Sequence, residues 1–506
     1  MTGAASAGGR RPARPSPPLR VAALLAAALL GGCAVVGPDY QTPRVAVPGR
    51  WSGAAAAQQR QQPQLSQWWR RLNDPVLNGL IEEAISGNLD VATAKAKIRE
   101  ARATRREAVG GLFPTLSGSA DAARNRTGGT STSSAGAGNI TYNTFSAGLD
   151  ASWELDLFGA NHRAVEAATY GVEAAEADLR ATLVTLVGDV ATAYVDARGY
   201  QARIALARRT ASSQRDTAAL TRTKFTAGSA SAVDAANADA EAASTAANIP
   251  LYEQSFAQDV HQLSVLLGRE PTALAERLKR TAPIPTPGRP LPTGIPADIL
   301  LVRPDVREAE RQLAQYTAKV GQAEAALYPS VSLTGSLSTS GTKIGDLAKN
   351  SSISWSFGPS VSVPIFQGGQ LTAEVDIARA QRDQYFIALR SAVLTALQDV
   401  ENALVNLSTQ RRNAAQLGQA VKGYQDAARL AHVLYQAGSE SFLDVLTADR
   451  SLYSAQDSLL QSRVAITKYY VALAKALGGG WDGAIDSSKP EVVDTNTGPH
   501  LAAAQN

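Results

Sequence analysis

The chain has almost no cysteine. Cys33 is the only one among 506 residues, so no disulfide can form within the chain and the fold must be stable without cross-links. A buried thiol or a catalytic cysteine would be expected deeper in the sequence. The position of Cys33 therefore points to a role near the N-terminus.

Residue types that carry catalysis and bind metals are also scarce. The four histidines, His162, His261, His432 and His500, do not have the spacing of metal ligands. The HExxH, P-loop and GxSxG motifs are missing. The string Gly478–Gly483 fits GxGxxG, but it ends a predicted helix instead of following a strand, which argues against a nucleotide site. The sequence therefore predicts no enzyme, no metal and no cofactor apart from a covalent lipid.

Proline is missing from two long stretches, Asn161–Phe225 and Gly368–Tyr435, although the chain has 24 prolines. A continuous helix of roughly 67 residues would span about 100 Å, and an ordinary globular domain has no use for two such rods. Aromatic residues make up only 6% of the chain. Much of the apolar content is alanine, which lets helices pack closely in a layer.

The proline-free stretches belong to a unit that occurs twice, and Gly228 and Gly438, 210 residues apart, mark corresponding points. The sequence predicts a signal peptide at 1–32, followed by a lipid-anchored extended segment at 33–75. The first repeat covers 76–281, with a β-hairpin at 114–158 and a long helix at 159–225, and a proline-rich connector at 282–296 follows it. The second repeat covers 297–480, with a β-hairpin at 329–366 and a long helix at 368–435, and a tail at 481–506 ends the chain.

Shorter helices complete the repeats. One is predicted over Val76–Gly110 from the helical spacing of its apolar residues. Return helices follow the two glycines: the first runs from Ser231, is broken at Pro250 and resumes to Leu267, and the second covers 442–477.

The N-terminus has the features of an export signal. Four arginines precede the apolar run Val21–Leu30, which is too short to span a membrane, and Gly31-Gly32-Cys33 follows. Without residues 1–32 the formal net charge falls from +4 to 0, because these residues contain four arginines and no acid. The apparent basicity belongs to the signal and gives no support to nucleic-acid binding.

Four segments alternate apolar with small polar residues. In the first copy the alternation covers 114–123 and 145–155, and in the second copy it covers 331–337 and 353–365. The polar faces consist mainly of Ser, Thr and Gly, and each strand is long enough to cross a bilayer. A soluble half-buried hairpin would show the same alternation. Aromatic residues such as Trp153 and Trp355, which suit an interfacial girdle, favour the membrane interpretation.

Four strands cannot close a barrel, and open edges in lipid would leave unpaired backbone groups that each cost several kcal/mol. Other copies of the chain must complete the sheet. Three copies would supply 12 strands. The sequence requires oligomerisation but does not determine the number of copies.

Several motifs in order along the mature chain resemble the outer membrane factor family, meaning the TolC/OprM-type efflux channels, and specifically its NodT-type lipoprotein branch. These motifs are Cys33 with Gly37-Pro38-Asp39-Tyr40, Trp68-Trp69 with Asp74-Pro75, Arg303-Pro304-Asp305, Tyr435-Gln436-Ala437-Gly438 and Leu443-Asp444-Val445-Leu446. The resemblance implies an α+β membrane protein with two internal repeats. Its trimer would form a 12-stranded outer-membrane β-barrel, four strands per chain, continuous with a long periplasmic α-helical barrel.

The resemblance also implies a function and partners. The chain would be the outer-membrane exit duct of a tripartite efflux system, with a periplasmic membrane-fusion adaptor and an inner-membrane transporter of the resistance-nodulation-division type. The adaptor would dock at the helical tips, Gly228-Ser229 and Gly438-Ser439. Cys33 resembles the lipidated cysteine of a lipobox, and the Ala34 that follows it implies sorting to the outer membrane.

The family often carries acids that surround the closed entrance, and Asp234 and Asp444 match that position. Either could also be an ordinary acid in the first turn of a helix. Tyr435 matches a tyrosine that latches the closed tip. Where some members have an arginine near that latch, this chain has Glu440, so we expect a gate held by packing and hydrogen bonds.

Three alternatives stay open at this stage. The first is a duct for protein secretion. The second is a lipid-anchored envelope rod without a pore, which explains the long helices and Cys33 but not four amphipathic strands. The third is an envelope hydrolase, for which no nucleophile or metal cluster can be named.

Overall fold

The computed structural model describes residues 35–52, 65–127, 140–288, 290–293, 296, 303–480 and 483–489. Cys33 and the predicted signal peptide lie outside these residues. The chain forms two compact units, each built from three stretches of sequence. Unit 1 contains residues 1–42, 102–171 and 312–385, and unit 2 contains 43–101, 172–311 and 386–506.

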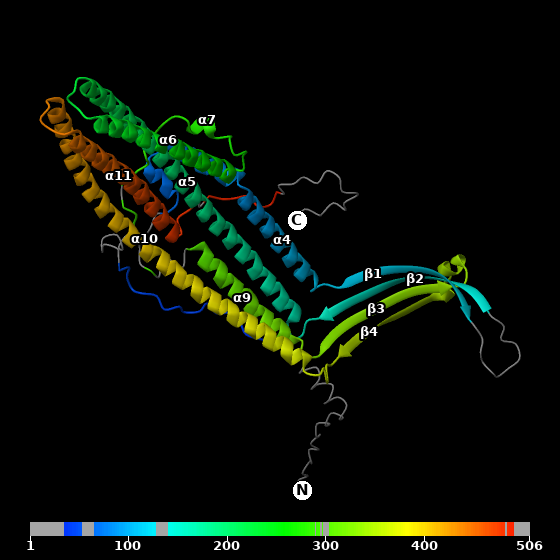
Figure 1. Ribbon diagram of the computed structural model, residues 1–506. Helices are drawn as coiled ribbons and strands as arrows, with labels where there is room; N and C mark the ends of the chain where they lie inside the picture. Colours follow the sequence, from blue (N-terminus) through cyan, green and yellow to red (C-terminus); the bar gives the residue numbers. More distant parts are fainter. Residues whose placement is uncertain are drawn as a thin grey trace, which may run out of the picture. The chain divides into compact units, whose positions relative to one another are not determined.

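Helices make up most of the described residues (Figure 1). Two of them, α5 and α10, have 67 residues each, where the sequence predicted helices over 159–225 and 368–435. No helix within the described ranges combines the length and the apolar character needed to cross a membrane. The helical elements are η1 (Trp68–Leu72), α3 (Pro75–Gly87), α4 (Leu89–Gly110), α5 (Ala160–Thr226), α6 (Ala232–Leu266), α7 (Ala275–Leu278), α9 (Pro304–Ala325), η2 (Ile344–Ala348), η3 (Asn350–Ser352), α10 (Gln370–Gln436) and α11 (Phe442–Ala476).

Unit 1 contains one antiparallel sheet in the order β1-β2-β3-β4. Its strands are β1 (Thr115–Thr127), β2 (Ile140–Leu155), β3 (Ser330–Gly341) and β4 (Ile353–Ser362). The two repeats meet where β2 pairs with β3, with Leu149 opposite Leu337, and Leu337 is in turn opposite Trp355. This register places the apolar residues of all four strands on one face and the Ser/Thr/Gly residues on the other.

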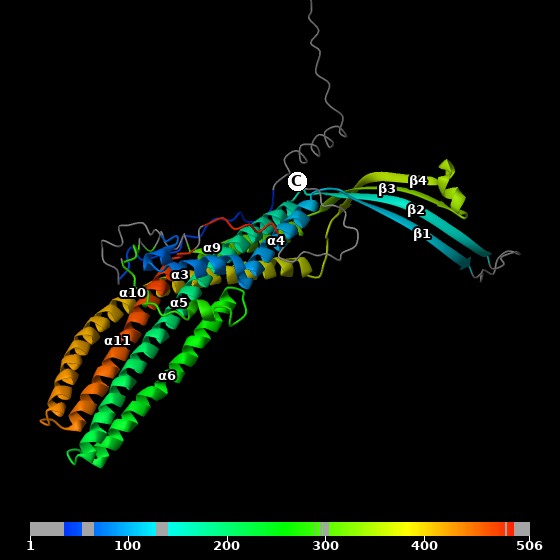
Figure 2. The same ribbon diagram turned by 90° about the horizontal axis from the view of Figure 1, so that it is seen from above.

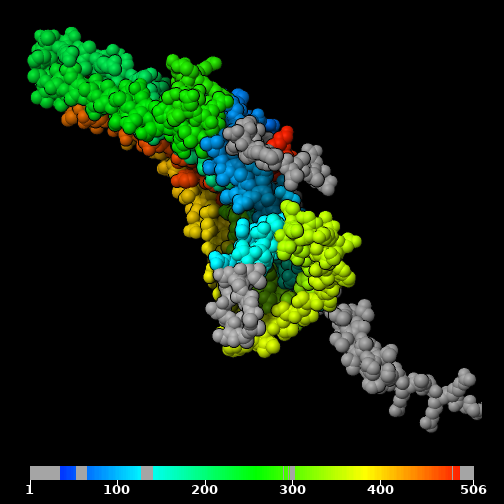
Figure 3. Space-filling view, turned by 90° about the vertical axis from the view of Figure 1, so that its right-hand side faces the viewer, coloured from blue at the N-terminus to red at the C-terminus, as the bar shows by residue number. Residues whose placement is uncertain are grey.

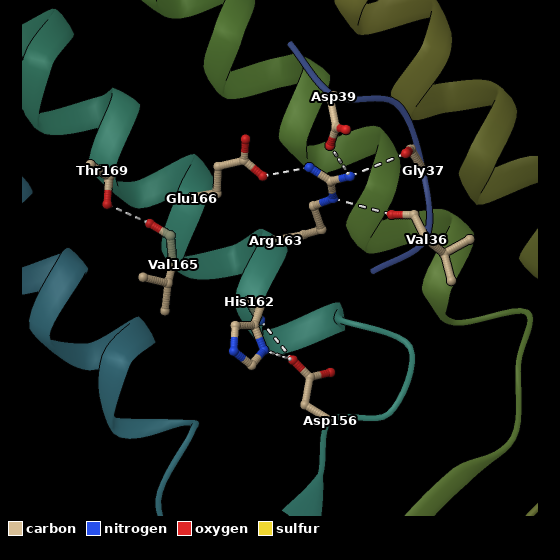
Figure 4. Close-up of polar contacts among 9 residues, drawn as sticks. All are labelled: Val36, Gly37, Asp39, Asp156, His162, Arg163, Val165, Glu166 and Thr169. Atoms are coloured by element: carbon tan, nitrogen blue, oxygen red, sulfur yellow. Dashed lines mark hydrogen bonds and ion pairs between the residues drawn. The ribbon is translucent and has the colours of Figure 1, made fainter. Parts of the chain in front are cut away.

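An arginine in the first turn of α5 holds the segment that follows the predicted lipid site (Figure 4). The Arg163 side chain is only 3% exposed. Its guanidinium donates to the carbonyl oxygens of Val36 and Gly37, both at 3.1 Å, and to the carboxylates of Asp39 at 2.8 Å and Glu166 at 2.6 Å. The Gly37-Pro38-Asp39-Tyr40 motif is therefore the binding partner of one buried side chain.

Gly37 fits this place because it has no side chain. Its φ of +92° favours glycine. A Cβ atom at Gly37 would lie 2.3 Å from the Cα atom of Gly321 in α9. The backbone of the N-terminal segment therefore lies directly against the backbone of a helix.

The core of unit 2 forms around the second motif, Trp68-Trp69 with Asp74-Pro75. The rings of Trp68 and Trp69 are buried, with centroids 6.1 Å apart, and Trp68 also meets Tyr470 of α11. Asp74 caps α3, because its Oδ1 accepts the backbone N–H groups of Val76 and Leu77 at 2.9 and 3.1 Å. The apolar stripe that predicted the helix is buried: Leu77, Leu80, Ile81, Ala84 and Ile85.

The Arg303-Pro304-Asp305 motif closes the end of α11. Arg303 donates from Nη1 to the carbonyl of Ala476, at the last turn of that helix, at 2.8 Å. Asp305 holds the guanidinium in place through two hydrogen bonds of 3.0 and 2.6 Å. The guanidinium of Arg303, together with the N–H of Val306, keeps the pKa of Asp305 below its usual range despite burial, which opposes the shift.

Three local predictions differ from the structure. The helix predicted over 76–110 is split at Asn88, because its Oδ1 caps α4 by accepting the Asp90 N–H at 2.8 Å and its Nδ2 donates to the Leu266 carbonyl at 2.9 Å. The return helix α6 is not broken at Pro250 but continues through it. The last predicted strand ends at Ser362 instead of 365, because Pro364 cannot donate to a ladder.

The continuity of α6 has a physical reason. A proline inside a helix removes one hydrogen bond and costs roughly 3 kcal/mol. Thr245 and Val260, on either side of Pro250, are buried. Packing on both sides of the proline therefore outweighs the local cost.

We expect the change Gly37→Ala to release residues 35–42 from unit 1. The added Cβ meets helix backbone, so the cost should be roughly 2 kcal/mol or more, which raises the open population about thirtyfold. Limited proteolysis of the intact protein in detergent would measure this as faster cleavage in this segment. The matched control is Gly49→Ala, where a Cβ meets no atom within 4 Å. Equal protease resistance of the two variants would contradict the assigned contact.

Candidate functional site: the tips of the two helical hairpins

The hairpins α5–α6 and α10–α11 end in turns of the same construction, and both turns lie at the same end of the helices (Figure 2). In the first, the Ser229 N–H donates to the Lys224 carbonyl at 2.8 Å, and in the second, the Ser439 N–H donates to the Leu434 carbonyl at 2.9 Å. Each turn reverses through a glycine with positive φ, at +76° and +81°. These are helix C-terminal motifs that need glycine.

The surface around these glycines is open. A Cβ added at Gly228 or Gly438 would meet no atom within 4 Å. Only the backbone conformation of each turn therefore requires glycine. The predicted docking residues Ser229 and Ser439 are exposed beside them.

Asp234 and Asp444 lie in the first turns of α6 and α11. The Asp234 carboxylate accepts the backbone N–H of Ser231 at 3.0 Å, and the Asp234 N–H donates to the Ser231 hydroxyl at 3.0 Å, which makes a capping box. The carboxylate of Asp444 accepts the hydroxyl of Ser441. Within one chain, both acids therefore support the serine N-caps of α6 and α11. The position also places their charge at the helix N-terminus, where the dipole favours it.

Tyr435 joins the two hairpins. Its side chain is buried, and its hydroxyl donates to Oγ1 of Thr221 in α5 at 3.1 Å. The Thr221 hydroxyl in turn donates to the Thr217 carbonyl at 2.9 Å. The ammonium of Lys224 donates to the Tyr435 carbonyl and lies 4.1 Å from the centre of its ring.

A small apolar cluster supports this contact. The ring of Phe442 meets Tyr435 edge-on at 5.9 Å. The other buried members are Ala218, Ala238, Val445 and Leu446. Glu440, which the sequence also assigned to the entrance, is exposed and lies outside the cluster.

Corresponding ion pairs join the two helices of each hairpin. In the first, Arg222 donates to Asp239 at 2.7 and 3.1 Å. In the second, Nε2 of His432 lies 2.9 and 3.0 Å from the two carboxylate oxygens of Asp449. In each pair the two residues are 17 positions apart, and the second pair lies 210 positions after the first. The repeat thus places a permanent charge in one hairpin and a titratable one in the other.

A cavity of about 300 Å³ lies farther along the hairpins, between α5 and α11. Its lining includes Lys468, which forms an ion pair with Asp196 at 2.7 Å, and Arg203, which forms one with Asp457 at 2.7 Å. These charges satisfy each other. Within the described ranges, no group of three or more His, Cys, Asp or Glu side chains is arranged to hold a metal ion.

Sequence reasoning missed Thr221, Lys224, His432 and Arg163. An available signal was the repeat itself, because shifting Arg222 and Asp239 by 210 positions gives His432 and Asp449. No such signal exists for Arg163, which binds two backbone carbonyls and two carboxylates.

Known proteins resemble this chain over most of its length. The family model "outer membrane efflux protein" matches the chain twice, over residues 80–269 and 295–479. Over 459 residues the chain is 36% identical to nodulation protein T of Rhizobium leguminosarum bv. trifolii, a match that covers 90% of this chain and 96% of that protein. The two matched ranges agree with the duplicated unit.

A second relative is the toluene efflux pump outer membrane protein TtgI of Pseudomonas putida, at 34% identity over 467 residues, 90% of this chain and 97% of that protein. Among solved structures, the outer-membrane channel OprN has 34% sequence identity and a TM-score of 0.82. The match covers 88% of this chain and 99% of that one.

We expect the α10–α11 hairpin, but not the α5–α6 hairpin, to loosen as the pH rises. The hydrogen bond to Asp449 raises the pKa of His432 above 6.5, against the opposing effect of burial. A raised pKa means that the stabilisation is fully present below about pH 6.5 and is lost as the pH rises through the folded-state pKa. Hydrogen exchange of the amides near His432 should therefore be about fivefold faster at about pH 8.5 than at about pH 5.5, after correction for intrinsic rates.

Two exchanges between the repeats provide the controls. His432→Arg should remove the pH dependence, and Arg222→His should create it in the α5–α6 hairpin. A pH dependence that survives His432→Arg would assign the effect to another group.

Proposed function

This chain belongs to the outer membrane efflux protein family, and on that premise we propose how it assembles, meets its partners and controls its entrance. The family, the α+β channel fold with two repeats and the efflux function predicted from the sequence are confirmed. The protein is an outer-membrane exit duct of the kind that serves tripartite efflux systems. The alternatives of a pore-free rod and a protein secretion duct are set aside.

The functional assembly is a homotrimer. The described sheet has two edge strands, β1 and β4, and three chains joined edge to edge give a closed barrel of 12 strands. Helix α10 supports this arrangement, because it leaves a row of apolar side chains exposed that a second copy can cover. They are Ile377, Ile387, Leu394, Val405, Leu430 and Val433.

The tips of the hairpins receive the periplasmic adaptor, which connects the duct to an inner-membrane transporter of the resistance-nodulation-division type. One observation carries this proposal: both repeats build the same open glycine turn, with an exposed serine, at the same end of the helices. A trimer would present six such turns, a set of equivalent sites for a ring of adaptor hairpins.

The entrance is controlled at the same tips. Asp234 and Asp444 from three chains supply six carboxylates around a threefold axis, which attracts cations. Tyr435 acts as the latch, held by its hydrogen bond to Thr221 and by Lys224. No arginine lock is needed for this contact.

A lipid on Cys33 anchors the chain in the outer membrane. The support is the Arg163 contact, because Cys33 lies only three residues before Val36, within about 10 Å of chain. A lipid attached there stays close to the start of α5, where the helices leave the sheet. The chain performs no catalysis, and its cargo is a small apolar or amphipathic compound, as the toluene-exporting relative suggests.

Adaptor docking is tested by placing bulk on both turns. Ser229→Trp with Ser439→Trp should lower co-purification of the cognate adaptor about tenfold or more, because the contact requires close approach of backbone. Conductance of the isolated protein in planar bilayers should remain. The control is Ser244→Trp, an exposed position in the middle of α6. Unchanged adaptor binding in the double variant would remove the tips as the docking site, and an absence of conductance in the unmodified protein would remove the channel.

The entrance charge is tested with Asp234→Asn and Asp444→Asn together. The amide oxygen can still accept from the cap serine, so only the charge is removed. We expect the sodium-to-chloride permeability ratio of the closed channel to fall severalfold. Asp426→Asn, an exposed acid on α10, is the matched control. An unchanged ratio would leave the two acids with their capping role alone.

A further inference from the structure

The apolar face of the sheet is not uniform along its length. Along this face β1 presents apolar residues from Leu116 to Ala122. The next two residues on the same face are Arg124 and Arg126, and both are exposed. Arg124 lies eight residues beyond Leu116, about 27 Å along the strand. That is comparable with the apolar band of about 25 Å on outer-membrane barrels. The two arginines therefore mark the end of the band farthest from α4 and α5.

The loop between β3 and β4 reaches the same end of the face. The Oγ1 atom of Thr339 donates to the Leu347 carbonyl at 2.9 Å, and Asp346 packs over Gly341. Both Thr339 and Gly341 belong to the apolar face, so η2 rests on that face. Figure 3 shows this yellow-green segment standing out beside the cyan strands β1 and β2.

A groove of about 500 Å³ lies under η2. Its lining is mainly small and apolar, and all of its residues belong to unit 1. They are Gly118, Ser119, Ala120, Ala147, Gly148, Leu149, Leu337, Ser338, Thr339, Leu347 and Ile353.

The rim of the groove has a positive charge. Lys343 and Lys349 flank η2, and Lys349 forms an ion pair with Asp346 at 2.7 Å. Gly341, beneath η2, pairs with Phe145, which in turn pairs with Ala122. Arg124 is the next residue of β1 on the same face, two positions beyond Ala122. Within 343–349, Asp346 is the only acid and there are two lysines. Arg124 and Arg126 on β1 add two more positive charges to this end of the face.

We propose that the groove and its rim bind an acylated, phosphorylated glycolipid of the outer leaflet, with an acyl chain under η2 and its phosphates against Arg124, Arg126 and Lys343. Cations on the lipid-facing side of a barrel are tolerated only near the interface, where an anion can neutralise them. A guanidinium matches the geometry of a phosphate, and the apolar groove excludes a water-soluble phosphate as the natural occupant. The inference rests on the proposed function, because this face meets lipid only when the trimeric barrel closes.

The test uses the full-length chain in nanodiscs of phosphatidylcholine that contain lipid A or, at equal charge, phosphatidylglycerol. Lipid retained through extraction is counted by native mass spectrometry. We expect lipid A to be retained in preference to phosphatidylglycerol. Arg124→Gln with Arg126→Gln should lower its affinity about tenfold or more.

Two further variants separate charge from shape. Ala147→Phe fills the groove without changing any charge and should also reduce retention. Arg106→Gln removes an exposed cation from α4 in the same unit and should have no effect. Equal retention by the unmodified protein and the double arginine variant, or equal loss in the Arg106 control, would overturn the proposal.

Conductance of the same preparations distinguishes a failure of the lipid site from a failure of the proposed duct. Conducting protein that retains no lipid A refutes the lipid site and leaves the duct intact. Protein that neither conducts nor forms a heat-modifiable oligomer refutes the barrel, and the lipid site fails with it.

Discussion

The hydrogen bonding of two edge strands is the constraint on which the rest of the structure depends. In the described sheet, β1 and β4 each have a partner on one side only. In hydrocarbon, every unpaired backbone group costs several kcal/mol, so the sheet can exist there only if other chains complete it. Closure then decides which face meets lipid and which encloses a lumen. It also requires the helices that continue from the strands to form a second ring. A duplicated chain suits this requirement, because each copy supplies one strand hairpin and one helical hairpin.

The duplication repeated the backbone features more faithfully than the side chains. Both tips have a glycine turn and a serine cap, because turn geometry allows few residues. Side chains differ where the hairpins meet. Tyr435 is buried against α5, whereas its counterpart Phe225 is exposed. By the repeat symmetry, Phe225 is placed where the first hairpin of one chain would meet the second hairpin of the next. The two kinds of hairpin contact in a trimer therefore use different chemistry, and only the contact within the chain has the hydrogen bond to Thr221.

Features that depend on local sequence could be predicted, and features that depend on distant contacts could not. The long helices followed from the absence of proline, and the strands followed from the alternation of apolar with small polar residues. The break at Asn88 was missed because its side chain needs the carbonyl of Leu266, 178 residues away. At Pro250 a break was predicted that the structure does not have, because the local cost of the proline was given more weight than the packing of α6. In the site, the turns and caps were visible in the sequence. The partners of Tyr435 and of Arg163 were not. Thr221, which binds Tyr435, lies in the other repeat, and two of the four groups that bind Arg163 are backbone carbonyls.

The polar face of the sheet explains why a duct of this kind need not choose its cargo. Some of its hydroxyl groups already have a hydrogen-bond partner in the sheet itself. The Oγ atoms of Ser336 and Ser356 lie 2.8 Å apart, and Thr115 donates to the Ser152 carbonyl at 3.2 Å. A hydroxyl that already has a partner gains little from a solute, and the other side chains of this face are mostly small and uncharged, so the attraction for any one compound is weak. Weak and similar attraction for many solutes permits rapid passage. Selection then has to take place before the tips are reached, in the proteins that deliver the cargo.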